Sequence, residues 1–392
     1  MKLRIRQWTP DRFNSIANCI ANLIKNDRYR AATLISKYIE INITTINQTI
    51  VKSKKLVMIM MPSYIAIFVY GAIVSSISFL IIYFLMPWYI RYLIKKGSVV
   101  LDYHKAKRPT VPRPAGPILF TGMAIGEIIL YLLVHDIRIL AVLATTAISF
   151  IIGYIDDVRI MPGWFKPVAL IFAGIPIIIL GAHGDHLNLI FGDAFIPILY
   201  LPLILAIIPI AGNTINSIDV LNGAATGFII IAALPLLLSV AIFGDNNILL
   251  SGLPMLFGTI AMYKFHKFPS KIFPGDSGTL LLGAMYGALA IAGNSEIIGA
   301  IALLPAVMNS FLFLSSVKKI VEHRNLKSRP TALTDDFKIK ASKEKTAPST
   351  LVRLLVAKGP LSEAEIVNRI FILAIFSSVL AFVSIIMQYY FT

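Results

Sequence analysis

The sequence is dominated by apolar runs that are long enough to cross a lipid bilayer. Hydrophobic residues make up 57% of the 392 residues, and charged residues make up 14%. A run of about 17–25 apolar residues forms a helix that spans a hydrocarbon layer roughly 30 Å thick and satisfies its own backbone hydrogen bonds. A soluble core cannot absorb this much apolar sequence. The chain is therefore predicted to be an all-α polytopic membrane protein.

We expect about ten transmembrane helices, with the polar loops of functional interest on one side. The connections after odd-numbered spans are rich in Lys and Arg, whereas the opposite connections carry only Arg138. Basic loops remain in the cytoplasm, so this asymmetry places the polar loops, and with them an active site, on the cytoplasmic face. The expected spans are 62–90, 117–134, 139–155, 167–182, 196–212, 224–243, 247–263, 278–293, 297–317 and 369–390.

The N-terminal part differs from everything that follows. Residues 1–56 are mixed polar and basic and contain no long apolar run. We interpret 1–56 as a basic extension of unknown role, preceding a ten-helix membrane domain at 57–392 that has a long cytoplasmic loop at 318–368. The single cysteine, Cys19, excludes an internal disulfide framework and a cysteine-ligated metal.

Two adjacent carboxylates, Asp156 and Asp157, end an apolar run abruptly, and Lys166 follows after a Pro-Gly turn. Acids at the edge of a hydrophobic segment are costly and usually functional. The pair could bind Mg²⁺, position a lysine or accept a proton. The alternative is that one of the acids only solvates the end of a helix.

Four polar residues recur every third position in the segment 213–222. On a helix this spacing drifts slowly and gives one polar stripe. Carboxylate and amide oxygens suit a hard cation, and amide edges suit a nucleobase or a sugar. The alternative is hydrogen bonding between membrane helices. The four residues are Asn213, Asn216, Asp219 and Asn222.

Three further loops on the same predicted face carry polar side chains. Gly275-Asp276-Ser-Gly278 opens the eighth span, where free helix N–H groups would attract phosphate and Asp276 could hold the accompanying Mg²⁺. Lys105 and Arg108 lie in a proline-rich basic loop that suits a phosphate, although ordinary cytoplasmic positive charge would give the same composition. The long loop contains His323, which has no partner for a zinc site, and Arg324, which suits phosphate or sugar oxygens.

Over residues 85–390 these motifs resemble the polyprenyl-phosphate N-acetylhexosamine-1-phosphate transferases, the superfamily of glycosyltransferase family 4. The specific features are the Asp-Asp pair with Lys nine residues later, the Asn-x-x-Asn-x-x-Asp-x-x-Asn-Gly stripe and the Gly-Asp-Ser-Gly turn, in that order. The Phe-Pro-Ser-Lys-Ile-Phe lead-in and the His-Arg pair resemble the archaeal and eukaryotic dolichyl branch. Asp219 instead matches the bacterial pattern, and Arg113 stands where the dolichyl enzymes have a glutamate.

The resemblance implies transfer of N-acetylglucosamine 1-phosphate from UDP-N-acetylglucosamine to a polyprenyl or dolichyl phosphate, with release of UMP, as in the first membrane step of N-glycosylation. It implies Mg²⁺, with Mn²⁺ as a substitute, held by Asn216 and Asp276. It implies Lys166 on the diphosphate and Asn222 near the uracil. By position, the resemblance puts the acidic pair at Asp156 and Asp157 and the sugar- and diphosphate-binding loop at His323 and Arg324.

Other expectations follow from this reading. We expect a location in the plasma membrane, or in the endoplasmic reticulum membrane of a eukaryote, with membrane lipids as partners and no nucleic acid. A homodimer is left open. The alternatives are a related UDP-sugar phosphotransferase that supplies lipid carriers for cell wall or polysaccharide, and a membrane transporter. A transporter would place ionisable groups near mid-membrane, and here only Glu127 does so.

Overall fold

The computed structural model describes residues 14–15, 17–18, 37, 65–105, 108–159, 161–318 and 328–391. The chain divides into two units, Met1–Ala66 and Ile67–Thr392. Almost all of the expected extension at 1–56 lies outside the described residues. The architecture below is that of the second unit.

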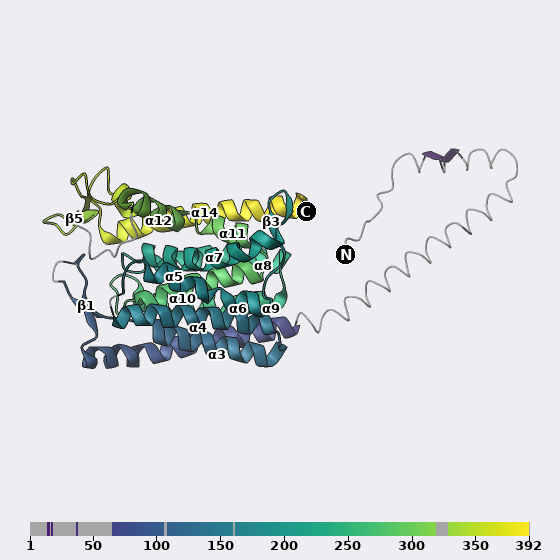
Figure 1. Ribbon diagram of the computed structural model, residues 1–392, viewed down its shortest axis with the longest axis horizontal. Helices are drawn as coiled ribbons and strands as arrows, with labels where there is room; N and C mark the ends of the chain where they lie inside the picture. The colour runs from purple at the N-terminus through teal and green to yellow at the C-terminus, as the bar shows by residue number, and fades with distance from the viewer. Residues whose placement is uncertain are drawn as a thin grey trace. The chain divides into compact units, whose positions relative to one another are not determined.

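The second unit is built almost entirely from helices that run alongside one another (Figure 1). The first long helix covers Ile65–Lys96. The others are α3 (Gly116–Val134), α4 (Ile137–Val158), α5 (Phe165–Ala173), α6 (Ile175–Ile179), α7 (Pro197–Ile218), α8 (Ala224–Phe243), α9 (Asn246–His266), α10 (Gly275–Ala292), α11 (Glu296–Ala302), α12 (Leu304–Val317), α13 (Leu351–Leu355) and α14 (Glu363–Phe391). This confirms the all-α polytopic fold class.

The expected count of ten spans is not confirmed. Helices occupy all ten expected segments, but within the described residues seven are long and apolar enough to cross a membrane. An eighth is obtained if α11 and α12, which meet at a bend of 70°, are taken as one span. The expected span at 167–182 is instead the short pair α5 and α6, because the helix is interrupted at Gly174 just before Pro176.

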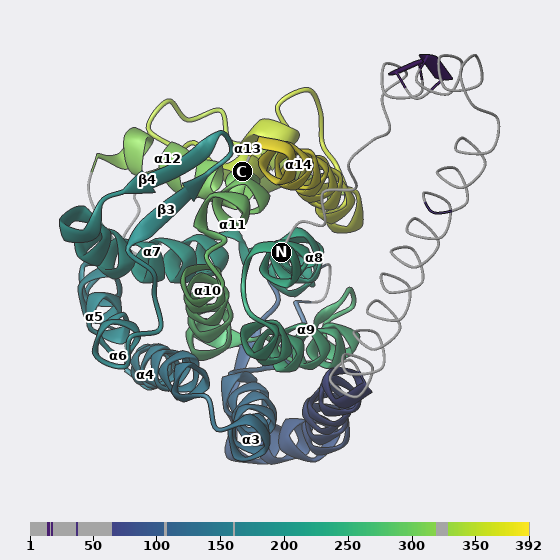
Figure 2. The ribbon, with the colours of Figure 1, turned by 90° about the vertical axis from the view of Figure 1, so that its right-hand side faces the viewer.

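Helix α10 lies inside the bundle, with α3, α4, α7, α8 and α9 around it (Figure 2). All 18 of its residues are buried. The outer helix Ile65–Lys96 shows the opposite behaviour, since only 28% of its most apolar window is buried. The outer helices therefore present apolar side chains to lipid, while α10 contacts only protein.

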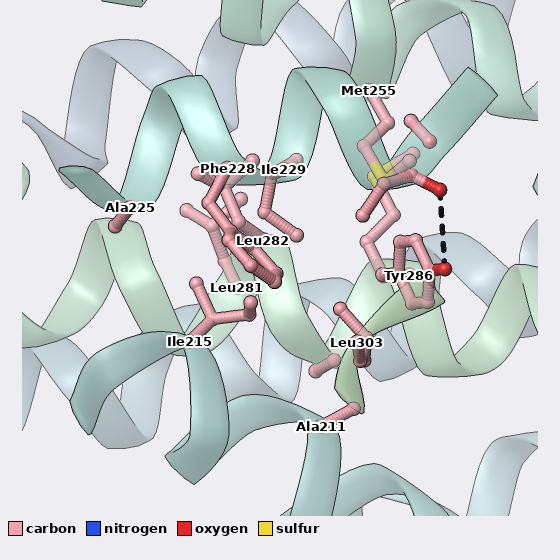
Figure 3. Close-up of a cluster of buried hydrophobic side chains, with 14 of the residues drawn as sticks. Ala211, Ile215, Ala225, Phe228, Ile229, Met255, Leu281, Leu282, Tyr286 and Leu303 are labelled. Atoms are coloured by element: carbon pink, nitrogen blue, oxygen red, sulfur yellow. Dashed lines mark hydrogen bonds between the residues drawn. The ribbon is translucent and has the colours of Figure 1, made fainter. Parts of the chain in front are cut away.

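A continuous apolar core surrounds the middle of α10. Phe228 and Ile229 of α8 pack with Leu281 and Leu282 of α10, and all four are fully buried (Figure 3). The hydroxyl of Tyr286, also on α10, donates to the carbonyl oxygen of Ala232 at 3.3 Å, so this aromatic side chain keeps a hydrogen-bond partner inside the apolar core. This packing fixes the position of α10 among its neighbours.

Three antiparallel β-hairpins connect helices at the two ends of the bundle (Figure 1). At one end, Val99 pairs with Pro112 and Leu333 with Ile339; at the other end, His186 pairs with Phe195. The strands are β1 (Val99–Leu101), β2 (Thr110–Pro112), β3 (His186–Leu189), β4 (Gly192–Phe195), β5 (Thr331–Leu333) and β6 (Ile339–Ala341). We call the end with β1 and β5 the site end, and the end with β3 the far end.

Candidate active site

The N-terminus of α10 is bound by a carboxylate from the end of α4. Oδ1 of Asp157 accepts a hydrogen bond from the backbone N–H of Asp276 at 2.9 Å. Oδ2 of Asp157 accepts from the backbone N–H and the hydroxyl of Ser277, at 2.9 and 2.6 Å. The expectation that these N–H groups attract a phosphate is therefore wrong, because a protein carboxylate already fills the anion position at this helix end.

Two glycines allow this contact. A Cβ at Gly153 would lie 2.5 Å from the carbonyl oxygen of Asp276, so only glycine lets α4 approach α10 this closely. Gly275 has a φ of +75°, and a Cβ there would lie 2.7 Å from Oδ2 of Asp157. The sequence pattern of glycines next to acids thus brings residues 119 positions apart into hydrogen-bond distance.

Arg113, at the start of the segment that enters α3, joins two of the acids. Its Nη2 donates to Oδ1 of Asp157 at 2.9 Å and to Oδ2 of Asp276 at 2.8 Å. Burial by itself would lower the pKa of Arg113, but the carboxylates of Asp276 and Asp157 raise it above its ordinary value. Arg113 is therefore a permanent cation between these two carboxylates.

Lys166, in the first turn of α5, joins the remaining pair of acids. Its Nζ lies 2.9 Å from Oδ2 of Asp156 and 3.4 Å from Oδ1 of Asp276. The second oxygen of Asp156, Oδ1, accepts from the backbone N–H of Met161 at 3.1 Å, which fixes the turn between α4 and α5. The adjacent acids thus have different contacts, since Asp156 contacts Lys166 and Asp157 binds α10 and Arg113.

The donor set is compatible with one divalent cation that keeps most of its water. Three carboxylates face two cations here, which leaves one formal negative charge at the cluster. Asp276 offers a carboxylate, and Mg²⁺ is usually held by one or two carboxylates with several waters. Among the residues that the structure describes, no three His, Cys, Asp or Glu side chains form a metal-binding group. A cation bound here would therefore have few protein ligands.

The predicted polar stripe is helical only in its first half. Asn213 and Asn216 lie on α7, which ends at Ile218. The amide of Asn213 donates to the carbonyl oxygen of Pro209 at 2.8 Å, and Oδ1 of Asn216 accepts from the hydroxyl of Thr279 on α10 at 2.9 Å. Asn216 thus contacts the same first turns of α10 that contain Asp276.

The expected continuation of the stripe as one helix is wrong. Asp219 is the C-cap of α7 and leaves the helical conformation with a ψ of 55°. Gly223, with a φ of +84°, reverses the chain into α8. Asn222 therefore lies in a turn and not on the face of α7 that carries Asn216.

Asn222 lies in a separate cluster of polar side chains at the site end. Its backbone N–H donates to Oε1 of Glu363 at 2.8 Å, and its Nδ2 donates to Oδ2 of Asp102 at 3.1 Å. Asp102 also forms an ion pair with Lys105, whose Nζ lies 5.0 Å from the ring centroid of Phe268. Because the amide N–H₂ faces the Asp102 carboxylate, Oδ1 of Asn222 points away from it. That buried oxygen has no hydrogen-bond partner among the described residues.

Asp219 is buried beside the acidic cluster. Its Oδ1 lies 3.5 Å from Nε2 of His266 and makes no hydrogen bond within the described part of the chain. Burial raises the pKa of Asp219 to about 7; the guanidinium of Arg113 opposes this rise, and the carboxylates of Asp276 and Asp157 add to it. Asp219 therefore titrates near neutral pH.

Of the remaining predicted residues, only Arg108 lies in the described part of the chain. The guanidinium of Arg108 is 5.9 Å from the ring centroid of Tyr103, and its residue is exposed. His323 and Arg324 lie outside the described residues. Glu363 was not predicted as a functional residue, because an acid in the first turn of an apolar helix is an ordinary helix-end residue. The partners of Arg113 could not be predicted from the sequence either, since they lie 44 and 163 positions away.

These features define a helical membrane protein that gathers acids and cations at one end of its bundle. Residues 139–294 match the sequence model of glycosyl transferase family 4. The matched region includes Asp156, Asp157, Lys166 and Asp276 but not Arg113. The resemblance that we drew from the motifs is confirmed.

Relatives in archaea cover most of the chain. A Saccharolobus solfataricus protein, provisionally named UDP-N-acetylglucosamine–dolichyl-phosphate N-acetylglucosaminephosphotransferase, is 28% identical over 299 residues, which are 74% of this chain and 89% of that protein. A provisionally named glycosyltransferase of Methanocaldococcus jannaschii is 29% identical over 80% of this chain and 95% of its own. The phospho-N-acetylmuramoyl-pentapeptide-transferase of Streptococcus suis is 29% identical over 49% of this chain and 61% of its own.

Proposed function

We propose that this protein transfers N-acetylglucosamine 1-phosphate from UDP-N-acetylglucosamine to a polyprenyl or dolichyl phosphate, releasing UMP. The observation that carries the proposal is the cluster at the N-terminus of α10, where Asp156, Asp157 and Asp276 meet Lys166 and Arg113. The match to the family model and the names of the archaeal relatives support the same reaction.

In this reaction an oxygen of the lipid phosphate attacks the phosphorus that bears the sugar. A new P–O bond forms, the bond from that phosphorus to the oxygen bridging it to UMP breaks, and the electron pair leaves with UMP. The second pKa of a phosphomonoester is about 6, so the attacking phosphate is already largely dianionic at neutral pH. A general base is not required, and we therefore assign Asp156 and Asp157 to positioning.

The main difficulty is the repulsion between two anionic phosphates. Lys166 and Arg113 provide positive charge where these phosphates must approach, and fixed cations of this kind stabilise charge that develops on the departing group. In our proposal Asp276 and Asn216 would hold Mg²⁺, for which Mn²⁺ could substitute, and the metal would act as a Lewis acid that offsets the negative charge of the diphosphate. Asn222 lies near the uracil, where its unpartnered Oδ1 can accept a hydrogen bond from the base.

The remaining parts of the proposal concern orientation and the second substrate. The basic connections of the sequence lie at the site end, and basic loops remain in the cytoplasm. We therefore place the site end in the cytoplasm. The lipid phosphate reaches the cluster from the edge of the bilayer. His323 and Arg324 contribute to sugar and diphosphate binding from the long loop.

The decisive experiment is a defined transferase assay. Purified protein receives Mg²⁺, dolichyl or undecaprenyl phosphate and a panel of UDP-sugars, and UMP and the lipid product are measured. We expect UMP release that requires both UDP-N-acetylglucosamine and lipid phosphate, stops in EDTA and is inhibited by tunicamycin. A preference for UDP-N-acetylmuramoyl-pentapeptide would indicate the cell-wall reaction instead. Transport of substrate into sealed vesicles without any UMP formation would refute the transferase assignment.

A further inference from the structure

One guanidinium nitrogen holds the two acids at the N-terminus of α10. Nη2 of Arg113 lies within 2.9 Å of carboxylate oxygens from both Asp157 and Asp276. The Arg113 side chain is 25% exposed, whereas the side chains of these acids are 1% and 12% exposed. Arg113 is therefore the most exposed member of this group, and the two carboxylates beside it are nearly buried.

The rest of the guanidinium has no partner within the described part of the chain. Nε and Nη1 of Arg113 make no hydrogen bond to any residue that the structure describes. A guanidinium presents five N–H donors in a planar fork that matches phosphate oxygens, and such pairs are frequently bidentate. Arg113 can therefore bind a phosphate group from the solvent side.

Both oxygens of Asp276 already have a cationic neighbour. Oδ2 accepts from Arg113 at 2.8 Å, and Oδ1 lies 3.4 Å from Nζ of Lys166. A divalent cation that binds Asp276 in this arrangement must compete with two positive charges that stand beside its ligand. Because like charges repel strongly where water is scarce, the arrangement disfavours metal binding while both cations stay in place.

We propose that Arg113 is a substrate-responsive counter-ion. Without nucleotide it neutralises Asp157 and Asp276, and on binding of the UDP-sugar its guanidinium moves to the diphosphate and exposes Asp276 to the divalent cation. This inference rests on the proposed function and adds to it an order of events. Metal and nucleotide then strengthen each other's binding, since linkage between two sites is reciprocal.

The test measures Mn²⁺ binding without turnover. Free Mn²⁺ is counted by electron paramagnetic resonance in the presence of purified full-length protein, with and without UDP-N-acetylglucosamine, and with no lipid phosphate. For the wild type we expect weak Mn²⁺ binding that the nucleotide strengthens about fivefold or more, the lower end of typical coupling between sites. Arg113→Gln should bind Mn²⁺ about fivefold more tightly than the wild type in the absence of nucleotide, and the nucleotide should then add little.

Arg138→Gln is the matched control, because Arg138 bridges two aspartates at the far end. It should leave both Mn²⁺ affinities unchanged. Unchanged or weaker Mn²⁺ binding by Arg113→Gln, with a wild type that binds both ligands, would overturn the role of Arg113 and leave the transferase assignment standing. A wild type that does not bind UDP-N-acetylglucosamine would overturn the proposed function and this inference with it.

A second variant keeps the test decisive where Arg113→Gln does not fold. Arg113→Lys retains the charge beside Asp276 but has a single nitrogen in place of the fork. Mn²⁺ binding without nucleotide should stay as weak as in the wild type, and the nucleotide-dependent increase should fall to less than half. Retention of the full increase in Arg113→Lys would contradict the transfer of the guanidinium to the diphosphate.

Discussion

The two ends of the bundle each have an arginine that bridges two aspartates, but the two clusters use it differently. At the far end, Arg138 donates to Asp136 through both Nε and Nη2, at 2.6–3.1 Å, and its Nη2 lies 3.1 Å from Asp245. At the site end, Arg113 donates to the described residues through Nη2 alone. Within the described part of the chain, Arg138 thus uses most of its N–H donors, whereas most donors of Arg113 have no protein partner.

The aspartates of the two clusters also differ in the groups that they contact. Asp136 caps α4 by accepting from the backbone N–H of Arg138 at 3.0 Å, and it also accepts from the amide of Asn247 at 3.1 Å. This cluster ties two helix ends together, which is an ordinary structural role. The site-end cluster adds a third carboxylate and Lys166, and both oxygens of Asp276 face cations instead of backbone. A similar arginine–aspartate bridge is thus a structural contact at one end and part of the candidate active site at the other.

The largest expected contrast comes from removing one acid at each end. Asp276→Ala should lower the rate of UMP release about 1,000-fold, because the proposed metal ligand and the partner of both cations are lost. Asp245→Ala at the far end should stay within about threefold of wild type, as expected for a half-exposed ion pair. UMP release under saturating substrates measures both. Undiminished release by Asp276→Ala would remove Asp276 from the site.

The second contrast concerns the cations. Lys166→Met keeps the length of the side chain and removes its charge, and we expect kcat to fall about 100-fold because developing charge on the phosphates is no longer stabilised. Arg138→Met should leave kcat nearly unchanged. Single-turnover rates with bound UDP-N-acetylglucosamine separate this effect from weaker binding. Equal losses in the two variants would mean that Lys166 acts only through folding.

The third contrast concerns stability. Asp157→Ala leaves two N–H groups of α10, the Ser277 hydroxyl and part of Arg113 without their partner, and we expect a loss of roughly 2–3 kcal/mol. Asp136→Ala removes a more ordinary helix cap and should cost about 1 kcal/mol. Thermal unfolding in detergent ranks the two variants. The opposite ranking would show that the site-end cluster does not stabilise the fold.

The smallest contrast is in pH dependence. Burial raises the pKa of Asp219 to about 7, so its protonated form is favoured in the folded protein and stability is lost as pH rises from about 4 to 7. Asp219→Asn should therefore unfold at a higher temperature than wild type at pH 8, with little difference near pH 4. The neighbouring charges of Arg113, Asp276 and Asp157 reduce or add to this shift without reversing it.

Asp136 provides the control of opposite sign. Hydrogen bonds from Arg138 lower the pKa of Asp136 to about 2, so its contribution to stability is present above pH 4 and is lost as pH falls toward 2. Asp136→Asn should change stability by the same amount at pH 5 and pH 8. A change in the stability difference between pH 5 and pH 8 for Asp136→Asn, or no such change for Asp219→Asn, would contradict the pKa shifts described for these two residues.

Much of the fold follows from local sequence, because apolar runs must become helices in a bilayer. All ten expected segments are helical, and the ends of α4 and α8 lie within a few residues of their predicted positions. The interruption between α5 and α6 and the bend before α12 were not predicted. Both breaks fall just before a proline in the first turn of the next helix, Pro176 in α6 and Pro305 in α12, and hydropathy does not register this effect.

The sequence predicted which residues form the candidate site, but it did not predict which of them contact one another. The motifs identified Asp156, Asp157, Lys166 and Asp276 as polar groups that gather at one face. They could not show that the α10 N-terminus binds Asp157 instead of a phosphate, because that choice depends on tertiary contact. The periodicity of 213–222 failed after Ile218, because Asp219 leaves the helical conformation there and Gly223 then turns the chain into α8.

The complete burial of α10 has a consequence for how the bilayer can influence this protein. Lipids contact the outer helices, but the helix that carries Asp276 in its first turn is buried along all 18 residues. Changes in membrane thickness or fluidity act first on the tilt of the outer helices, while the close glycine contacts between α4 and α10 keep their mutual distance. The membrane should therefore regulate how the lipid substrate arrives, and leave the spacing of the acids in the cluster unchanged.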